Sequence, residues 1–102
     1  MANTRTSYRI EWRPKAREDL RAIIHDVEKE GVGKAYAFGQ ALRDRIEPLA
    51  QNPELGRAGR PGLPDYVREL VVDAHYIVFY RVLGQARIVE ILRMKHAAQH
   101  AP

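Results

Sequence analysis

The chain has 102 residues, which is enough for one domain with a modest core and too few for a separate cofactor domain. It contains no cysteine, so disulfide bonds and thiolate metal sites are excluded, and a domain of this kind fits the cytoplasm. Lys and Arg number 17 against 13 Asp and Glu, a formal net charge of +4 that favours an acidic partner, either a nucleic acid or an acidic protein segment.

The ends of the chain carry no sign of a membrane protein. The first residues are polar, and no apolar run approaches the length of a membrane span, so we expect neither a signal peptide nor a transmembrane helix. We predict a single domain over residues 1–102 with its core at about 8–99.

The first segment predicts a strand followed by a helix. Residues Tyr8–Trp12 alternate between aromatic or aliphatic and charged side chains, as in a half-buried strand. Pro14 suits the first turn of a helix that ends near Glu30. Apolar residues recur along this helix with helical spacing, at Ala16, Leu20, Ile23, Ile24 and Val27.

A second helix follows a glycine-rich break. Gly31 and Gly33 interrupt the first helical pattern, and a new apolar stripe then runs from about Gly33 to Ala50. Pro48 lies inside this stripe and should kink or end the helix. Because the link between the helices is short, we expect an antiparallel αα-hairpin.

The second half of the chain predicts a long loop and an antiparallel meander. Residues Asn52–Pro64 form a loop of 13 residues with three glycines and three prolines, and loops of this length are often functional. The three predicted strands are Val67–Val72, His75–Leu83 and Ala86–Met94. Gly84-Gln85 suits a two-residue type II′ turn, and Asp73–His75 supplies the other reversal.

The middle strand is apolar on both faces. Tyr76, Val78, Tyr80 and Val82 alternate with Ile77, Phe79 and Leu83, and Arg81 stands among the latter. A helix hairpin covers only one face of a sheet, so the other face must meet the rest of the chain, a second copy or a partner. The expected fold is α+β, an N-terminal strand and an αα-hairpin followed by a three-stranded antiparallel meander that the first strand joins.

The order of these elements, together with several short segments, resembles a known family. The segments are YRIEWRPKAREDL, NPELGR, VRELVV, YIVFYRV and VEILRMKH. Taken together they are similar to the ParE/RelE superfamily of bacterial type II toxins over roughly residues 8–99, with the same α+β fold. The resemblance implies a small toxin that forms a hetero-oligomer with a cognate antitoxin, whose acidic C-terminal segment wraps the helix hairpin and the sheet. The antitoxin contacts it suggests are Leu20, Ile24, Tyr76, Val78 and Tyr80.

The two branches of the superfamily act on different targets. RelE-like members cut mRNA on the ribosome, whereas ParE-like members poison DNA gyrase. The RelE branch typically has an arginine after the tyrosine that opens the central strand, where this chain has Ile77, and two lysines that here match Arg68 and Leu70. The resemblance therefore favours a ParE-like gyrase inhibitor that is not an enzyme and needs no cofactor or metal. A RelE-like endoribonuclease and a non-toxic antitoxin-binding homologue remain the alternatives.

Basic residues of the sheet and the loop are the candidate contacts to the target. They are Arg60, Arg68, Arg81, Arg93, Lys95 and His96. In the nuclease alternative His96 acts as the base, and Arg81 or Arg93 holds the phosphate. Structural roles compete with these: Arg81 could pair with Glu69 or Glu90 across strands, and Arg68 could pair on the surface with Glu69. His96 and His100 have a metal-ligand spacing, but no third ligand is near them in the sequence, so we expect no metal site.

Overall fold

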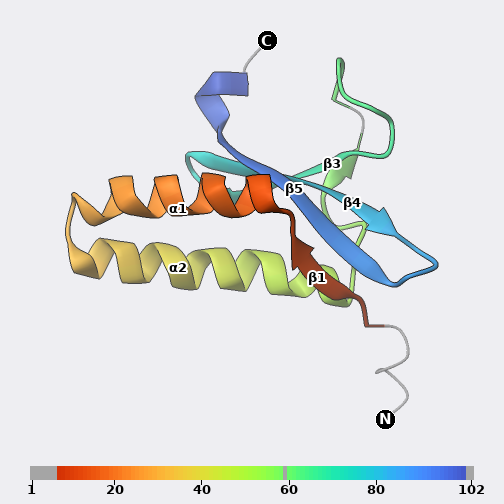
Figure 1. The fold of residues 1–102 in the computed structure, drawn as a ribbon, viewed down its shortest axis with the longest axis horizontal. Helices are drawn as coiled ribbons and strands as arrows, with labels where there is room; N and C mark the ends of the chain where they lie inside the picture. The colour runs from red at the N-terminus through yellow and green to blue at the C-terminus, as the bar shows by residue number, and fades with distance from the viewer. Residues whose placement is uncertain (1–6, 59, 101–102) are drawn as a thin grey trace.

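The computed structural model describes residues 7–58 and 60–100, and it has the predicted α+β architecture. Two helices lie side by side and run in opposite directions along one side of a twisted sheet (Figure 1). The elements in chain order are β1 Arg9–Trp12, α1 Pro14–Glu28, α2 Val32–Ile46, the 3₁₀ helix η2 Glu47–Ala50, β2 Arg57–Ala58, β3 Arg68–Asp73, β4 Tyr76–Leu83, β5 Ile88–His96 and the 3₁₀ helix η3 Ala97–His100.

The sheet has the strand order β1-β5-β4-β3-β2. The predicted meander of β3, β4 and β5 is confirmed, and β1 joins it parallel to β5, with Ile10 opposite Val89. The short strand β2 pairs antiparallel with β3, and it lies within the segment that the sequence predicted as loop. Strand β1 and β2 are therefore the two edges of the sheet.

The helix ends follow from proline and glycine. Pro14 opens α1 as expected, and Gly31, with φ of 123°, precedes α2 in a conformation that only glycine adopts readily. The prediction for Pro48 is confirmed, because α2 ends at Ile46 and the chain continues as η2. A proline inside an α-helix lacks the N–H for the helical hydrogen bond and its ring clashes with the preceding turn.

The main core lies between the helices and the sheet. The helical segments bury Phe38, Leu42 and Leu49 against Val78 and Ile91 of the central strands. Helix α1 buries only Ala16 completely, and the rest of its apolar stripe is partly exposed along one side. This incomplete cover leaves an apolar groove beside α1.

The predicted turn between β4 and β5 is wrong. The strands are joined by four residues, Gly84–Arg87, and the register pairs Leu83 with Ile88. Gly84 does not have the positive φ of a type II′ turn, whereas Arg87 has a φ of 56°. A longer loop that ends in a left-handed residue also matches the twist of the strands, and it delays the start of β5 from Ala86 to Ile88.

The face of the sheet away from the helices, here called the outer face, is covered in part by the chain itself. Ile77 and Phe79 of β4 form a second small cluster with Val67. The guanidinium of Arg60 lies 5.8 Å from the centre of the Phe79 ring. The apolar pattern required the rest of the chain, a second copy or a partner to cover this face. The chain itself covers Ile77 and Phe79, while Val71 stays exposed.

Candidate functional site

Two buried glutamates organise the outer face. Glu69 of β3 is 6% exposed and Glu90 of β5 is 7% exposed, although both lie on the face that no helix covers. A carboxylate is rarely so buried unless a partner compensates its charge. In each case two arginines supply positive charge near the carboxylate.

Glu69 binds Arg60 and Arg57. The Nε and Nη2 atoms of Arg60 donate to the two carboxylate oxygens of Glu69, both at 2.8 Å, in the parallel arrangement that guanidinium and carboxylate groups favour. These hydrogen bonds raise the pKa of Arg60 above its usual value. Arg57 approaches the same carboxylate at 3.8 Å from the edge strand β2 and is largely exposed. Glu69 is thus neutralised by Arg60 and has a second cation beside it.

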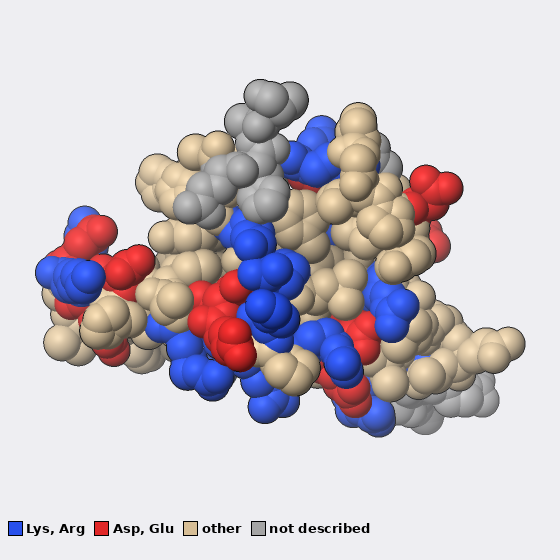
Figure 2. Space-filling model, turned by 45° about the horizontal axis from the view of Figure 1, so that its top comes forward, with Lys and Arg blue, Asp and Glu red and all other residues tan. Residues whose placement is uncertain are grey.

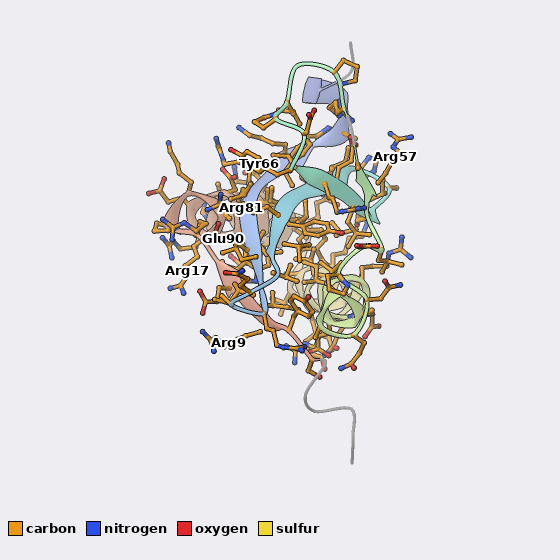
Figure 3. All side chains as sticks on the ribbon, turned by 90° about the vertical axis from the view of Figure 1, so that its right-hand side faces the viewer. Arg9, Arg17, Arg57, Tyr66, Arg81 and Glu90 are labelled. Atoms are coloured by element: carbon orange, nitrogen blue, oxygen red, sulfur yellow. The ribbon has the colours of Figure 1, made fainter. Side chains whose placement is uncertain are left out.

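Glu90 repeats this arrangement. Arg81 of β4 donates to Glu90 at 2.6 Å, which confirms the cross-strand pairing as the structural role of Arg81. Arg13, at the end of β1, approaches the other carboxylate oxygen at 3.6 Å. The Arg81 guanidinium also lies 5.6 Å from the ring centre of Tyr66, which comes from the loop before β3 (Figure 3). Arg81 is thereby fixed between a carboxylate and an aromatic ring.

Arg93 lies apart from these pairs, against α1. Its guanidinium donates to Asp19 through Nε at 2.8 Å and Nη2 at 3.0 Å, and the backbone N–H of Met94 donates to the same carboxylate at 2.9 Å. Burial alone would raise the pKa of Asp19, but these hydrogen bonds and the charges of Arg93 and Lys95 hold it below its usual value. Arg93 therefore joins β5 to α1.

Arg68 also has a structural role, which differs from the surface pairing with Glu69. Its guanidinium donates to the carbonyl oxygens of Glu54 at 3.3 Å and of Gly56 at 2.8 Å. The Tyr80 hydroxyl secures the same loop, because it donates to the Pro53 carbonyl and accepts the Gly56 N–H. Burial raises the pKa of Tyr80.

The end of β5 divides its basic residues between the two faces. Lys95 is opposite Ile77 on the outer face, whereas His96 is opposite Tyr76 on the helix side. The His96 ring lies 5.7 Å from that of His75 and 5.2 Å from that of Tyr76, and its Nδ1 accepts the N–H of Ala98. Arg93 and His96 thus have different partners, whereas Lys95 lies near both, because its charge also lowers the pKa of Asp19 and it lines one hollow of about 230 Å³ with Asp19 and His96.

The residues of the nuclease alternative do not meet. Arg81 is opposite Glu90, and His96 lies six residues further along β5, which corresponds to about 20 Å of strand. Arg93 is closer in sequence, but its guanidinium donates twice to Asp19. A general base must be within hydrogen-bonding reach of the proton that it takes, so His96 and Arg81 do not form one catalytic site in this structure.

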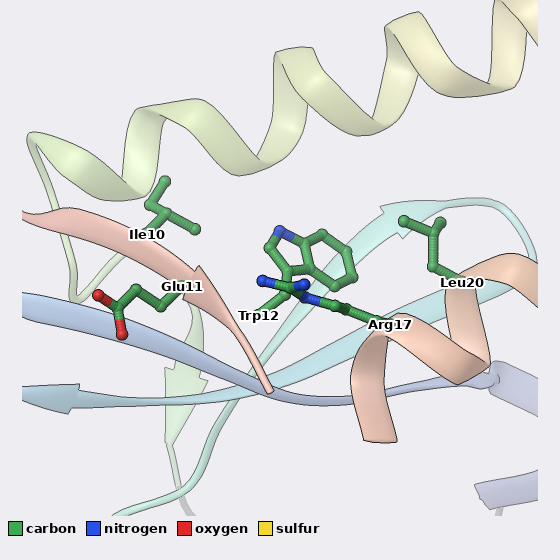
Figure 4. Close-up of a pocket in the computed structure, with 5 residues that line it drawn as sticks. All are labelled: Ile10, Glu11, Trp12, Arg17 and Leu20. Atoms are coloured by element: carbon green, nitrogen blue, oxygen red, sulfur yellow. The ribbon is translucent and has the colours of Figure 1, made fainter. Parts of the chain in front are cut away.

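The second candidate surface is the apolar groove between β1, α1 and α2. One hollow of about 420 Å³ is lined mainly by aliphatic and aromatic side chains, with one cation and one carboxylate among them: Ile10, Trp12, Leu20, Ile24, Gly39, Leu42, Arg43, Ile46 and Glu47. A neighbouring hollow of about 530 Å³ extends it past Glu11 and Arg17. Figure 4 shows Trp12 and Leu20 facing this space from β1 and α1.

The residues predicted to contact an antitoxin fall into two groups. Leu20 and Ile24 line the groove, and Tyr76 is half-buried beside a separate hollow at the far end of the hairpin. Val78 and Tyr80 are each 0% exposed, because they lie under the helices in the main core. Their predicted contact with an antitoxin is therefore wrong for the folded chain.

Sequence reasoning missed several residues of these surfaces. Arg13 and Arg57 were not among the candidates, although each flanks a buried glutamate. The sequence did contain a signal, because Glu69 and Glu90 lie in largely apolar strand segments. A carboxylate buried in such a strand needs a cation nearby. The groove residues Ile10 and Trp12 could have been found from the strand alternation alone.

Charged residues of both signs are interleaved on the surface where α1 meets the sheet. Figure 2 shows blue and red side chains together across the middle of this face, with tan areas on either side. Within residues 7–58 and 60–100, no group of three or more His, Asp or Glu side chains is placed to hold a metal ion. In the same part of the chain, no helix has the length and apolar character needed to cross a membrane.

Comparisons with known proteins agree with this fold. The family model described as "ParE toxin of type II toxin-antitoxin system, parDE" matches residues 10–101. Y4kP of Sinorhizobium fredii, described as a candidate toxin, is 36% identical over 95 residues, which covers 92% of this chain and 93% of that protein. Toxin RelE2 of Caulobacter vibrioides is 32% identical over 90 residues, covering 88% of this chain and 96% of that toxin.

The solved structures show the same relationship. A chain of the chromosomal ParDE toxin–antitoxin system from P. aeruginosa superimposes with a TM-score of 0.72 and 30% sequence identity, covering 89% of this chain and 97% of that one. The family match spans nearly all of the described residues, including both candidate surfaces. The chain therefore belongs to the ParE toxin family of type II toxin–antitoxin systems.

Proposed function

We propose that this toxin acts in the cytoplasm as a ParE-like inhibitor of DNA gyrase, which blocks replication. The observation that carries this proposal is the match of the ParE family model to residues 10–101. The geometry of the sheet supports it, because Arg60, Arg81 and Arg93 are each engaged by a carboxylate instead of converging on one point.

The arrangement of cations argues against a RelE-type nuclease. Cleavage of RNA requires donors aimed at the scissile phosphate and a base close to the attacking hydroxyl. Removal of one such donor typically lowers the rate by about 10²–10³-fold, so a site that lacks several has little activity left. Messenger-RNA cleavage is retained as the second candidate function because one relative, 32% identical, is named toxin RelE2.

A plasmid cleavage assay separates these functions. The purified chain is incubated with supercoiled plasmid, with and without gyrase, and in parallel with translating ribosomes and mRNA. We expect linear plasmid only when toxin and gyrase are both present, and intact mRNA. Cleaved mRNA with intact plasmid would transfer the assignment to the nuclease alternative, and neither product, from folded protein, would identify a non-toxic homologue.

The groove is the proposed docking site for the antitoxin. Its floor is formed by apolar side chains such as Trp12, Leu20 and Ile24, which an amphipathic segment would bury. Two cations, Arg17 and Arg43, and two carboxylates, Glu11 and Glu47, line it as well, so the apolar floor and not a net charge carries this proposal. Tyr76 lies near the far end of α1 and could extend the contact along the hairpin.

Two variants with the same charge change test this docking site. Leu20→Glu places a carboxylate in the groove, and Val32→Glu places one at the start of α2, where the native side chain is 83% exposed. We expect Leu20→Glu to weaken antitoxin binding by about tenfold or more, because the bound antitoxin would bury the new carboxylate without a partner. A loss of about 1.4 kcal/mol in binding free energy already corresponds to a factor of ten. Val32→Glu should bind as the unmodified chain does. Equal affinities of the two variants, measured by calorimetry on folded proteins, would place the antitoxin elsewhere.

A further inference from the structure

We propose that the outer face of the sheet binds the phosphate backbone of duplex DNA directly, which extends the proposed action on gyrase to the DNA that gyrase holds. The residues concerned are Arg13 and Arg57, supported by the anchored pairs Arg60–Glu69 and Arg81–Glu90. We call this set the arginine face.

The arginine face uses the same arrangement twice. Each buried glutamate holds one arginine at 2.8 Å or less, namely Arg60 or Arg81, and this pair satisfies the charge of the carboxylate. The second arginine stands further away and is more exposed: Arg57 at 3.8 Å with 79% of its side chain exposed, and Arg13 at 3.6 Å with 57% exposed. Each glutamate keeps its closer arginine, so these two more distant and largely exposed guanidinium groups can turn to a phosphate without leaving a buried carboxylate unpaired.

The charge of the outer face is positive and lies at its surface. The strand register and the ion pairs place on it the basic residues Arg9, Arg13, Arg57, Arg60, Arg81 and Lys95 and the acidic residues Glu11, Glu69 and Glu90. Glu69 and Glu90 are buried beneath their arginines. Glu11 is half-exposed at the β1 edge and is paired with Arg9 at 2.8 Å. Away from that edge an approaching anion meets guanidinium groups first, and guanidinium binds phosphate through paired hydrogen bonds.

The chemistry of the face favours duplex DNA over the other polyanions. An acidic protein segment also needs apolar anchors, and in this molecule those lie in the groove beside α1. Single-stranded nucleic acid is held mainly by stacking of its bases on several aromatic side chains. Among the described residues of the outer face, Tyr66 is the exposed aromatic residue, and its ring is already paired with Arg81. Cations without stacking platforms suit a duplex, whose bases are stacked on one another.

The expected binding is weak and sensitive to salt. Two outer arginines, with Lys95 at the margin, can neutralise about two to three phosphates, so the logarithm of the binding constant should fall with the logarithm of salt concentration with a slope of about −2 to −3. Affinity without sequence preference lies typically in the micromolar range or weaker. Such binding would be measurable at low salt and would add to the affinity for a gyrase–DNA complex.

The test measures binding of the full chain to fluorescent duplex DNA of about 25 base pairs by anisotropy over a salt series, without gyrase. The double variant Arg13→Ala/Arg57→Ala removes both outer arginines and leaves each glutamate its anchoring arginine. The control variant Lys29→Ala/Lys34→Ala removes the same charge from the tip of the helix hairpin, where both lysines are exposed. We expect the arginine variant to lose about tenfold in affinity or more and about two units of salt slope, and the lysine variant to change by less than about threefold.

Three results would overturn the proposal: no binding of the unmodified chain to duplex DNA at low salt, equal losses in the two double variants, or tighter binding to single-stranded RNA of the same length. Thermal unfolding and antitoxin binding of both variants show whether they are folded. Because gyrase is absent from this assay, its failure leaves the proposed inhibition of gyrase standing. Conversely, a toxin that does not poison gyrase can still bind duplex DNA through the arginine face.

Discussion

Arg93 offers the sharpest test of the structure, because it was predicted to contact the target and is found in a structural ion pair. Both guanidinium donors reach Asp19, whose carboxylate also accepts the Met94 N–H. If this pair joins α1 to β5, then Arg93→Ala destabilises the fold. If Arg93 instead serves the target, the variant folds normally and loses only toxicity.

The magnitude follows from the burial and geometry of the pair. The side chains of Asp19 and Arg93 are 16% and 37% exposed, which lies between surface pairs, worth about 0.2–1 kcal/mol, and buried ones, whose disruption costs about 3–5 kcal/mol. Two parallel charge-assisted hydrogen bonds place the coupling energy at about 1–2 kcal/mol. Arg93→Ala alone should cost about 2 kcal/mol, because it leaves the mostly buried carboxylate with the Met94 N–H.

The assay is a double-mutant cycle in urea with Asp19→Ala, Arg93→Ala and the double variant. The exposed pair Glu30–Lys34, at 3.6 Å, provides a matched cycle in which we expect no more than about 0.5 kcal/mol. A coupling energy for Asp19–Arg93 as small as that of the control pair, in folded proteins, would refute the structural role. Loss of toxicity in a fully stable Arg93→Ala variant would then return this residue to the target surface.

The same cycle has a defined pH dependence. The pKa of Asp19 is lower in the folded than in the unfolded chain, so the folded state binds fewer protons in the acid range. The stability that Asp19 contributes is therefore complete above its unfolded pKa, near 4 for an ordinary aspartate, and disappears as the pH falls through the lower folded value. We expect the coupling energy to be constant from neutral pH down to about 5 and to shrink below about 4.

Thermal unfolding checks three further predictions. Tyr80→Phe removes the hydroxyl that binds Pro53 and Gly56 and should cost about 1–3 kcal/mol. Gly56→Ala should cost a similar amount, because its Cβ would lie 2.6 Å from the Glu69 carbonyl oxygen, and overpacking of this kind typically costs about 1–3 kcal/mol. Arg87→Gly should stabilise the chain by up to about 1 kcal/mol, because it relieves the positive φ of 56° in the β4–β5 loop. An unchanged melting temperature in any of these variants would contradict the corresponding contact or conformation.

The parts of the fold that depend on local periodicity were predictable. The alternation in Tyr8–Trp12 and in the central strand gave β1 and β4, and the apolar stripes gave both helices. The length of the β4–β5 loop was not predictable from Gly84, because the register of β5 is set by its pairing with two neighbouring strands. Strand β2 escaped notice because only its partner β3 gives those two residues a strand conformation.

The site residues were also predictable where their contacts are local and unpredictable where the contacts depend on long-range packing. The pairing of Arg81 with Glu90 could be anticipated, since the two residues lie on strands joined by a hairpin and face the same side. The pairing of Arg93 with Asp19 could not, because 74 residues separate them and only the docking of α1 on β5 brings them together. Arg60 reaches Glu69 from a long loop whose path the sequence does not specify. Basic residues that are close in sequence were therefore predicted to share one site, but the fold gives several of them different partners.

The arginine face and the apolar pattern of β4 have a common physical explanation. A sheet face that carries Ile77 and Phe79 and receives no second layer would expose these side chains to water. Arginine covers such a surface well, because its stem and planar head pack on aromatic groups while the charge stays hydrated, as Arg60 does on Phe79. The buried glutamates fix these heads in orientation, which a lysine could not match for want of a second parallel donor. The positive charge of the sheet is thus a consequence of how its outer face is covered, and it becomes available to an anionic partner on the side opposite the helix hairpin.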